Sequence, residues 1–307
     1  GSRPQPDSRR RFTMSHALRL TLLLFCAALL NACSPALIID DRYQARSQDS
    51  RSQYIVLHYT SSGFERSLHT LTEQDVSSHY LISDHDPVIY RLVDENRRAW
   101  HAGESSWRGR TWLNSSSIGI ELVHPGYIDQ ASCRRWPPWD PRQIDALIRL
   151  LRDIQQRHGI SPENVLGHSD IAPQRKVDPG PLFPWQQLID AGVAVGPDPQ
   201  RQRVMQHWLG GRIPTISWFQ NALHDWGYDA PLHGELDEAT RNVIAAFQMR
   251  FRPARFDGLP DSETAAILAA LVPGQASILL NQSAPQWFDP DANSLPPRLP
   301  PCSASGD

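Results

Sequence analysis

Short apolar runs rich in β-branched residues alternate with helical patterns between residues 53 and 195, and this alternation restricts the possible folds more than any other feature. Residues 54–59 (YIVLHY) and 118–123 (IGIELV) are apolar enough to form buried central strands. Further strand patterns occupy residues 80–82, 88–93 and 165–167. The order predicts an α/β domain with a mixed central sheet flanked by helices.

The clearest helical pattern covers residues 141–158. Asp140 is a suitable N-cap, Pro141 suits the first helical position, and Gly159 suits the end of a helix. One apolar stripe runs along this segment at helical spacing: Ile144, Leu147, Ile148, Leu151 and Ile154. We expect this helix to be one of those that flank the sheet.

A second domain is expected after the α/β domain, because the pattern over residues 214–272 is purely helical. Its first helical face is apolar: Ile216, Phe219, Leu223 and Trp226. Acidic and hydroxyl residues then precede two further helical patterns, at residues 234–240 and 257–264, as at helix starts. We expect a three-helix domain at 214–272, a linker at 196–213, and a Pro-rich tail at 273–307 that is extended or disordered from Pro285 onward.

Residues 1–32 are expected to be a leader and not part of the fold. Gly1 and Ser2 have the appearance of a cloning remnant, and the apolar stretch 20–30 is shorter than the ~20 residues that cross a membrane, although it suits a signal peptide. The stretch ends in Leu-Asn-Ala-Cys at Cys33, which resembles the lipobox of bacterial lipoproteins; a plain signal peptide is the alternative. The lipobox resemblance implies lipidation of Cys33 and a tether over residues 33–52. It also implies a periplasmic protein on the inner leaflet of the outer membrane.

Composition excludes several classes of protein. The 30 basic and 33 acidic residues give a formal charge of −3, so nucleic acid is not expected as a partner. An apolar content of 40% and a charged content of 21% describe a globular chain.

Only one of the 30 basic residues, Lys176, is a lysine.

Two cysteines, Cys133 and Cys302, remain if Cys33 carries lipid and the segment before it is removed. An oxidising periplasm permits them to pair. The sequence leaves the pairing open, because Cys302 lies in the Pro-rich tail. There is no CxxC motif, and a thiolate zinc site is therefore not expected.

Three residues could form a metal site. His58 and His168 each end a predicted strand, and Asp178 follows in the next loop. Two imidazoles and one carboxylate with an open fourth position are typical of catalytic zinc, Zn²⁺, where bound water becomes a nucleophile. Each residue alone is a weak signal, since the chain has 12 histidines.

Five short motifs in fixed order strengthen this interpretation. They are residues 57–60 (LHYT), 78–80 (SHY), 99–103 (AWHAG), 114–121 (NSSSIGIE) and 167–173 (GHSDIAP). Together they resemble the type 2 N-acetylmuramoyl-L-alanine amidases, the Amidase-2 or peptidoglycan-recognition-protein superfamily, and within it the AmpD-like and AmiD-like bacterial enzymes. AmiD-like members are lipoproteins with a C-terminal peptidoglycan-binding domain, which suits the helical segment here.

The resemblance implies a zinc hydrolase that cuts the amide between the muramic acid lactyl group and L-alanine of peptidoglycan or muropeptides. It implies His58, His168 and Asp178 as zinc ligands. It also implies catalytic roles for Glu121 and Lys176. The substrate groove would include Trp100, His101, Ala102, Asn114 and His79. Ser78 occupies the position where phage lysozyme-like amidases have a catalytic Tyr, which shifts the role of base to Glu121.

Two kinds of alternative stay open from the residues alone. Alternation along the strand permits Glu121 to face either the site or solvent, with Gly119 and Val123 on the same face. The function could also be that of a catalytically silent wall-binding lipoprotein, or of a zinc endopeptidase that cuts stem peptides. The motifs indicate neither an oligomeric state nor a preference between 1,6-anhydro and intact muramyl substrates.

Overall fold

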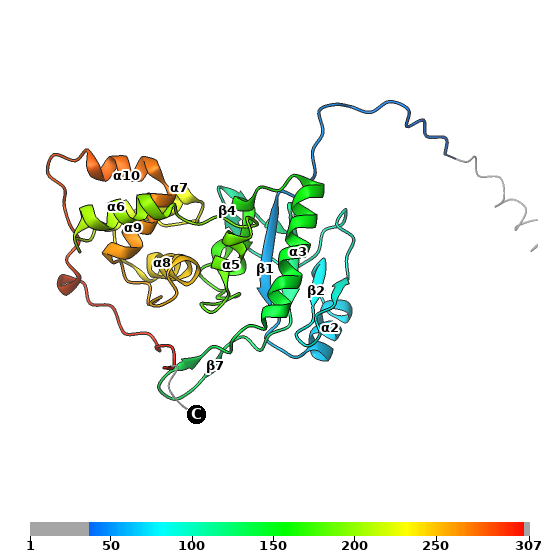
Figure 1. The fold of residues 1–307 in the computed structure, drawn as a ribbon, viewed down its shortest axis with the longest axis horizontal. Coiled ribbons are helices and arrows are strands. Elements are labelled where there is room, and N and C mark those ends of the chain that lie inside the picture. Colours follow the sequence, from blue (N-terminus) through cyan, green and yellow to red (C-terminus); the bar gives the residue numbers. More distant parts are fainter. Residues whose placement is uncertain (1–36, 304–307) are drawn as a thin grey trace, which may run out of the picture. The chain divides into compact units, whose positions relative to one another are not determined.

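A computed structural model describes residues 37–303 of the 307-residue chain (Figure 1). The expected signal peptide and Cys33 lie outside the described residues. Residues 49–303 belong to one compact unit, whereas residues 37–48 lie outside it and contain neither helix nor strand. Within residues 37–303, no helix has both the length and the apolar character needed to cross a membrane.

The core of the first domain is a five-stranded sheet in the order β3-β2-β6-β1-β9. Four strands run parallel, and β3 is antiparallel to β2, so the predicted mixed sheet is confirmed. The strands are β1 (Tyr54–Tyr59), β2 (Tyr80–Ile82), β3 (Ile89–Arg91), β6 (Ser117–Leu122) and β9 (Val165–Gly167). Two small hairpins are β4 (Ser106–Trp107) with β5 (Arg110–Thr111), and β7 (Ile128–Asp129) with β8 (Arg134–Arg135).

The helix α3 (Pro141–His158) lies beside β1 and covers one face of the sheet (Figure 1). Its start and end are as predicted: the Asp140 side chain accepts a hydrogen bond from the backbone N–H of Arg142, and Gly159 has the left-handed conformation. The predicted apolar stripe packs with Ile55 and Leu57 of β1. Shorter elements complete the domain: α2 (Phe64–Glu73), α4 (His168–Ile171), α5 (Trp185–Asp190), η2 (Leu113–Ser115) and η3 (Pro162–Asn164).

The helical domain contains the three predicted helices, α7 (Ile216–Trp226), α8 (Glu238–Phe251) and α9 (Ser262–Leu271). The segment expected as a linker contains a further helix, α6 (Pro199–Leu209). The prolines at 197 and 199 suggested an extended linker, but Asp198 caps this helix, and Met205 and Leu209 are buried on its apolar side. A fifth helix, α10 (Pro273–Leu280), begins the segment that was expected to be tail.

The rest of the tail, as far as residue 303, contains one short 3₁₀ helix, η4 (Pro290–Ala292), and otherwise neither helix nor strand. A disulfide joins Cys302 to Cys133 beside β8, which answers the pairing that the sequence left open. The backbone N–H of Cys302 also donates to the carbonyl of Arg134, at 2.9 Å. The tail therefore returns from the helical domain to the α/β domain.

The two domains share one apolar cluster. The second face of the sheet contributes Val56 and Leu166, and the helical domain contributes Phe219 and Phe247 to the same buried group. The domains therefore pack as a single compact unit, although the sequence suggested two domains joined by a linker.

Candidate active site

A pocket of about 390 Å³ opens where β1 and β6 end, beside the start of α4. Ligands of open α/β sheets commonly bind outside the carboxyl ends of parallel strands. Hydroxyl side chains supply much of one wall: Thr60, Ser61, Ser62, Ser67, Thr70 and Ser77. No role was predicted for these residues, although Thr60 lies in the motif at residues 57–60 and the run Thr60–Ser62 directly follows the strand of His58.

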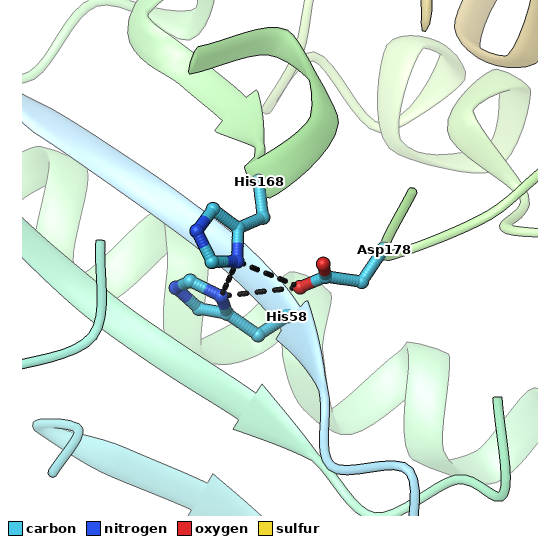
Figure 2. A group of neighbouring side chains, drawn as sticks. All are labelled: His58, His168 and Asp178. Atoms are coloured by element: carbon cyan, nitrogen blue, oxygen red, sulfur yellow. Dashed lines mark hydrogen bonds and ion pairs between the residues drawn. The ribbon is translucent and has the colours of Figure 1, made fainter. Parts of the chain in front are cut away.

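Three predicted metal ligands line this pocket, and Figure 2 shows that their side chains point toward one another. His58 lies near the end of β1, His168 begins α4, and Asp178 projects from the following loop. The two Nδ1 atoms of the histidines are 2.9 Å apart, and Oδ2 of Asp178 lies 3.2 Å from Nδ1 of His58 and 3.1 Å from Nδ1 of His168. All three residues are buried.

The neighbours of His58 determine which of its ring nitrogens carries the proton. The hydroxyl of Ser117 donates to the carbonyl of Leu113, at 2.6 Å, and can therefore accept from Nε2 of His101, at 3.0 Å. Nδ1 of His101 is then the acceptor for Nε2 of His58, at 2.9 Å. This series of hydrogen bonds leaves Nδ1 of His58 without a proton, and that atom faces the other two ligands.

His168 also presents a proton-free Nδ1 atom to the other two ligands. Its Nε2 lies 3.1 Å from the carbonyl of Ala102, which can only accept, so a neutral imidazole has a bare Nδ1. Burial, and then the charge of His168, lower the pKa of His58 to about 4, so His58 is neutral at pH 7. Burial alone would raise the pKa of Asp178, but a protonated His168 or His58 would donate to its carboxylate, which holds the pKa of Asp178 well below its usual range. A proton shared by this group therefore binds a histidine before it binds Asp178.

Three proton-free acceptor atoms therefore face one another at about 3 Å, and a cation between them would relieve their repulsion. A tetrahedral zinc ion with ligand distances of about 2.0–2.1 Å separates its ligand atoms by roughly 3.3 Å, close to the spacing here. No other group of three or more metal-ligand side chains occurs in residues 37–303. The donor set fits zinc with one coordination position left over.

Glu121 faces the pocket, which answers the alternative that strand alternation left open. It lies on β6 directly beside His58, and its Oε2 atom is buried with no hydrogen-bond partner among the described residues. Burial, and then the charge of Asp178, raise the pKa of Glu121 to about 8, while the Lys176 ammonium opposes this. A carboxyl group with a pKa near neutrality is suited to proton transfer.

Lys176 also lines the pocket. Its backbone N–H donates to the carbonyl of Ala172, at 3.0 Å, which fixes the loop two residues before Asp178. Within residues 37–303, its ammonium group has no hydrogen bond or ion pair with a side chain. The ammonium group is therefore available to a ligand of the pocket.

The residues expected to bind substrate separate into two groups. Trp100 lines the pocket with 54% of its surface exposed, and the guanidinium of Arg98 lies 4.3 Å from its ring centroid. His101 also borders the pocket, but both ring nitrogens are engaged by His58 and Ser117. Trp100 thus remains a candidate for substrate contact, whereas His101 supports a metal ligand.

Ala102, Asn114 and His79, also expected from the motifs to contact substrate, are buried and do not line this pocket. The side-chain oxygen of Asn114 accepts the backbone N–H groups of His101 and Ala102, at 3.1 and 2.7 Å. Nδ1 of His79 accepts the backbone N–H of Gly119, at 3.0 Å, on the strand that carries Glu121. These buried side chains support the backbone from which the pocket residues project.

Sequence reasoning missed two supporting residues. Ser117 completes the hydrogen-bond chain to His58. Gly119 leaves room for His101, because a Cβ atom there would lie 2.4 Å from the imidazole Cγ. Both lie in the motif at residues 114–121, and the Ser-x-Gly pattern places both side-chain positions on one face of the strand.

Comparison with known proteins agrees with this geometry. A family model described as N-acetylmuramoyl-L-alanine amidase matches residues 48–181, and one described as a putative peptidoglycan binding domain matches residues 212–268. N-acetylmuramoyl-L-alanine amidase AmiD of Escherichia coli (strain K12) is 47% identical over 245 residues, which is 76% of this chain and 87% of that protein. The 1,6-anhydro-N-acetylmuramyl-L-alanine amidase AmpD of the same strain is 40% identical over 113 residues, 37% of this chain and 56% of AmpD.

Two groups of solved structures are similar over most of their length. The complex of E. coli AmiD with the substrate anhydro-N-acetylmuramic acid-L-Ala-D-gamma-Glu-L-Lys has a TM-score of 0.71 at 45% identity, covering 77% of this chain and 94% of that one. AmpDh3 from Pseudomonas aeruginosa has a TM-score of 0.71 at 38% identity, covering 78% and 99%. Both similarities include the helical domain as well as the sheet, because the α/β domain alone is too short to reach this coverage.

Proposed function

The chain belongs to the N-acetylmuramoyl-L-alanine amidase family, and from that premise we propose that it is a zinc-dependent member that cuts the lactyl–L-alanine amide of peptidoglycan or muropeptides. The observation that carries the proposal is the triangle of proton-free ligand atoms on His58, His168 and Asp178, with Glu121 beside it. The match of the helical domain to a putative peptidoglycan binding domain supports a wall substrate.

The chemistry needs a nucleophile and a way to release a poor leaving group, because an amide is unreactive. Zinc bound at the triangle would supply a more acidic water and would polarise the carbonyl. Glu121 lies beside His58 and can take the proton of the attacking water and deliver it to the departing amine of L-alanine.

Lys176 supplies a positive charge on another wall of the same pocket. We assign it to the carbonyl oxygen, where negative charge develops as the amide is attacked. Trp100 and the hydroxyl-rich wall can hold the sugar, since aromatic faces and hydroxyl groups suit carbohydrate. These residues would orient the amide toward Glu121.

We further propose that Cys33 is lipidated and holds the protein in the periplasm, on the inner leaflet of the outer membrane. The support is the Leu-Asn-Ala-Cys sequence after an apolar stretch of signal-peptide length. In a Gram-negative host, the full chain should incorporate labelled fatty acid and fractionate with outer membranes, and Cys33→Ser should do neither. A Cys33→Ser variant that still carried label would contradict this assignment.

Digestion of purified sacculi tests the reaction. An amidase releases free peptides that begin with L-alanine and leaves bare glycan strands, which mass spectrometry identifies. Removal of zinc with a chelator should stop the release, and added zinc should restore it. Peptide that stays attached to muramic acid after digestion, with cuts inside the stem peptide, would indicate the endopeptidase instead. No cleavage by zinc-loaded protein that still binds sacculi would indicate a silent wall-binding protein.

A further inference from the structure

A buried cluster of charged and polar side chains connects the helical domain to the segment that carries His168. Arg250 of α8, Tyr228 after α7 and Asp170 of α4 expose 5%, 1% and 1% of their surfaces. Nη1 of Arg250 donates to Oδ2 of Asp170 at 2.7 Å, and the hydroxyl of Tyr228 donates to Oδ1 of Asp170. The helical domain therefore supplies a partner to each oxygen of this buried carboxylate.

The same guanidinium holds both sides of His168. Residues 165–170, which we call the His168 corner, comprise β9 and the first three residues of α4. Nη2 of Arg250 donates to the carbonyl of Val165 on the strand side, at 3.1 Å, while Asp170 lies on the helix side. Oδ2 of Asp170 also accepts the backbone N–H of Gly167, at 2.7 Å. The corner is thus fixed before and after the histidine by one residue of the other domain.

Asp178, another of the proposed metal ligands, is hydrogen-bonded to the same corner. The backbone N–H of Ser169 donates to the carbonyl of Asp178, at 2.9 Å. A shift of the corner would therefore move the side chains of His168 and Asp178 away from their positions relative to His58. Two of the three ligands depend on the corner.

Docking of the domains does not by itself require this cluster. The shared apolar core already joins them through residues such as Leu166 and Phe247. A buried ion pair adds little net stability, because desolvation offsets much of the attraction, but it fixes geometry through directed hydrogen bonds. Such a cluster is better suited to orienting the corner than to holding the domains together.

We propose that Arg250 and Tyr228 are positioning residues of the catalytic centre, through which the helical domain holds His168 and Asp178 in ligating geometry. This inference rests on the proposed zinc site. It gives the helical domain a second role, beyond attachment to the wall. The two family matches, over residues 48–181 and 212–268, each contain only one side of this contact.

Zinc affinity is the first test, measured on the full chain by competition with a chelator of known affinity. Arg250→Met should weaken zinc binding roughly 10- to 100-fold, the range seen when a residue that orients a ligand is removed. Tyr228→Phe, which is nearly isosteric and should fold, should weaken it by up to about 10-fold. In both variants, the visible spectrum of the cobalt-loaded protein should change, because the ligand geometry changes.

Arg252→Met is the matched control. Arg252 follows Arg250 by two residues and is also buried, but its partners Asp261 and Glu263 belong to the helical domain. The Arg252→Met substitution should destabilise the helical domain. It should change the zinc affinity by less than about threefold. Equal loss of zinc in Arg250→Met and Arg252→Met would overturn the inference, as would unchanged zinc affinity in Tyr228→Phe and Arg250→Met.

Amide hydrogen exchange of zinc-free protein gives a readout that does not depend on metal. Peptides covering the His168 corner should exchange faster in Arg250→Met and Tyr228→Phe than in wild type, and at the wild-type rate in Arg252→Met. Unchanged exchange in Arg250→Met would count against the inference. Wild-type protein that bound no zinc would instead overturn the proposed function, and exchange would still decide whether the helical domain holds the corner.

Discussion

Replacement of Glu121 by glutamine should stabilise the zinc-free protein at neutral pH and abolish turnover. The carboxyl group lines the pocket beside His58, and one of its oxygens is buried without a hydrogen-bond partner among residues 37–303. Glutamine keeps the size of the side chain but carries no charge. The substitution therefore removes the cost of burying a carboxylate together with the proton-transfer group.

The size of this stability difference follows from two pKa values. The ordinary pKa of a glutamate is 4.5, and the pKa of Glu121 in the folded protein is about 8. Because the folded pKa is the higher one, the stability contributed by this group is fully present below pH 4.5 and is lost as the pH rises through 8. At pH 7 the loss is about 3 kcal/mol, and above pH 8 it approaches about 5 kcal/mol, at about 1.36 kcal/mol per pH unit. The Glu121→Gln variant should not show this pH-dependent loss of stability.

Urea unfolding in the presence of a chelator measures the effect, at about pH 4.5 and again at about pH 7. The variant should match wild type at the lower pH and exceed it by about 3 kcal/mol at the higher pH. Glu104→Gln, at an exposed glutamate, serves as control and should track wild type at both. A stability difference that does not change with pH would refute the reasoning, because the cost would then not come from ionisation of Glu121.

The same variant separates the two roles that a pocket carboxylate could have. Zinc content should remain near one ion per chain, since Glu121 is not among the three ligand residues. Release of peptides from sacculi should be lost. Loss of zinc comparable to that in His168→Ala would mean that Glu121 supports the metal site and is not the base.

Three further predictions concern other parts of the chain. Lys176→Arg should keep zinc but lower peptide release at least about 10-fold, because a planar guanidinium replaces a compact charge in the pocket; near-normal release would show that the lone lysine has no chemical role. Ser117→Ala should weaken zinc binding by about 10-fold in chelator competition, since His101 loses its partner, whereas Ser117→Thr keeps the hydroxyl and should bind nearly normally. Cys302→Ser should lower the free energy of unfolding by about 2–5 kcal/mol in urea, because the disulfide spans 169 residues; a loss below about 0.5 kcal/mol would contradict this.

The sequence predicted the parts of the fold that depend on local pattern. The apolar run 54–59 became a central strand, and the amphipathic segment 141–158 became a helix with the expected cap. The same reasoning failed at residues 199–209, where two nearby prolines suggested a linker. Proline is well tolerated at the first position of a helix, and Asp198 provides the cap, so the prolines mark the start of α6 and not an extended segment.

Motif matching identified the residues around the site but could not separate those that touch a ligand from those that hold other residues. Asn114 and His79 illustrate the difference, because both are buried and bonded to backbone N–H groups. Strand alternation places a side chain on one face or the other, but the depth of burial behind a pocket wall depends on neighbours from distant segments. Only the three-dimensional arrangement shows that His101 faces His58 with both nitrogens engaged.

The contact between Arg250 and Asp170 was invisible for a related reason. The two residues are 80 positions apart and belong to segments with separate, self-consistent patterns. Each looks ordinary alone: a basic residue in the last turn of a helix is favourable there, and an acidic residue suits the first turn. Local electrostatics thus explains both residues so well that no anomaly remains to indicate a partner. A buried pair whose members each satisfy a local rule leaves no sign in the sequence pattern. Coupling between the helical domain and the proposed metal ligands therefore has to be argued from the packed structure.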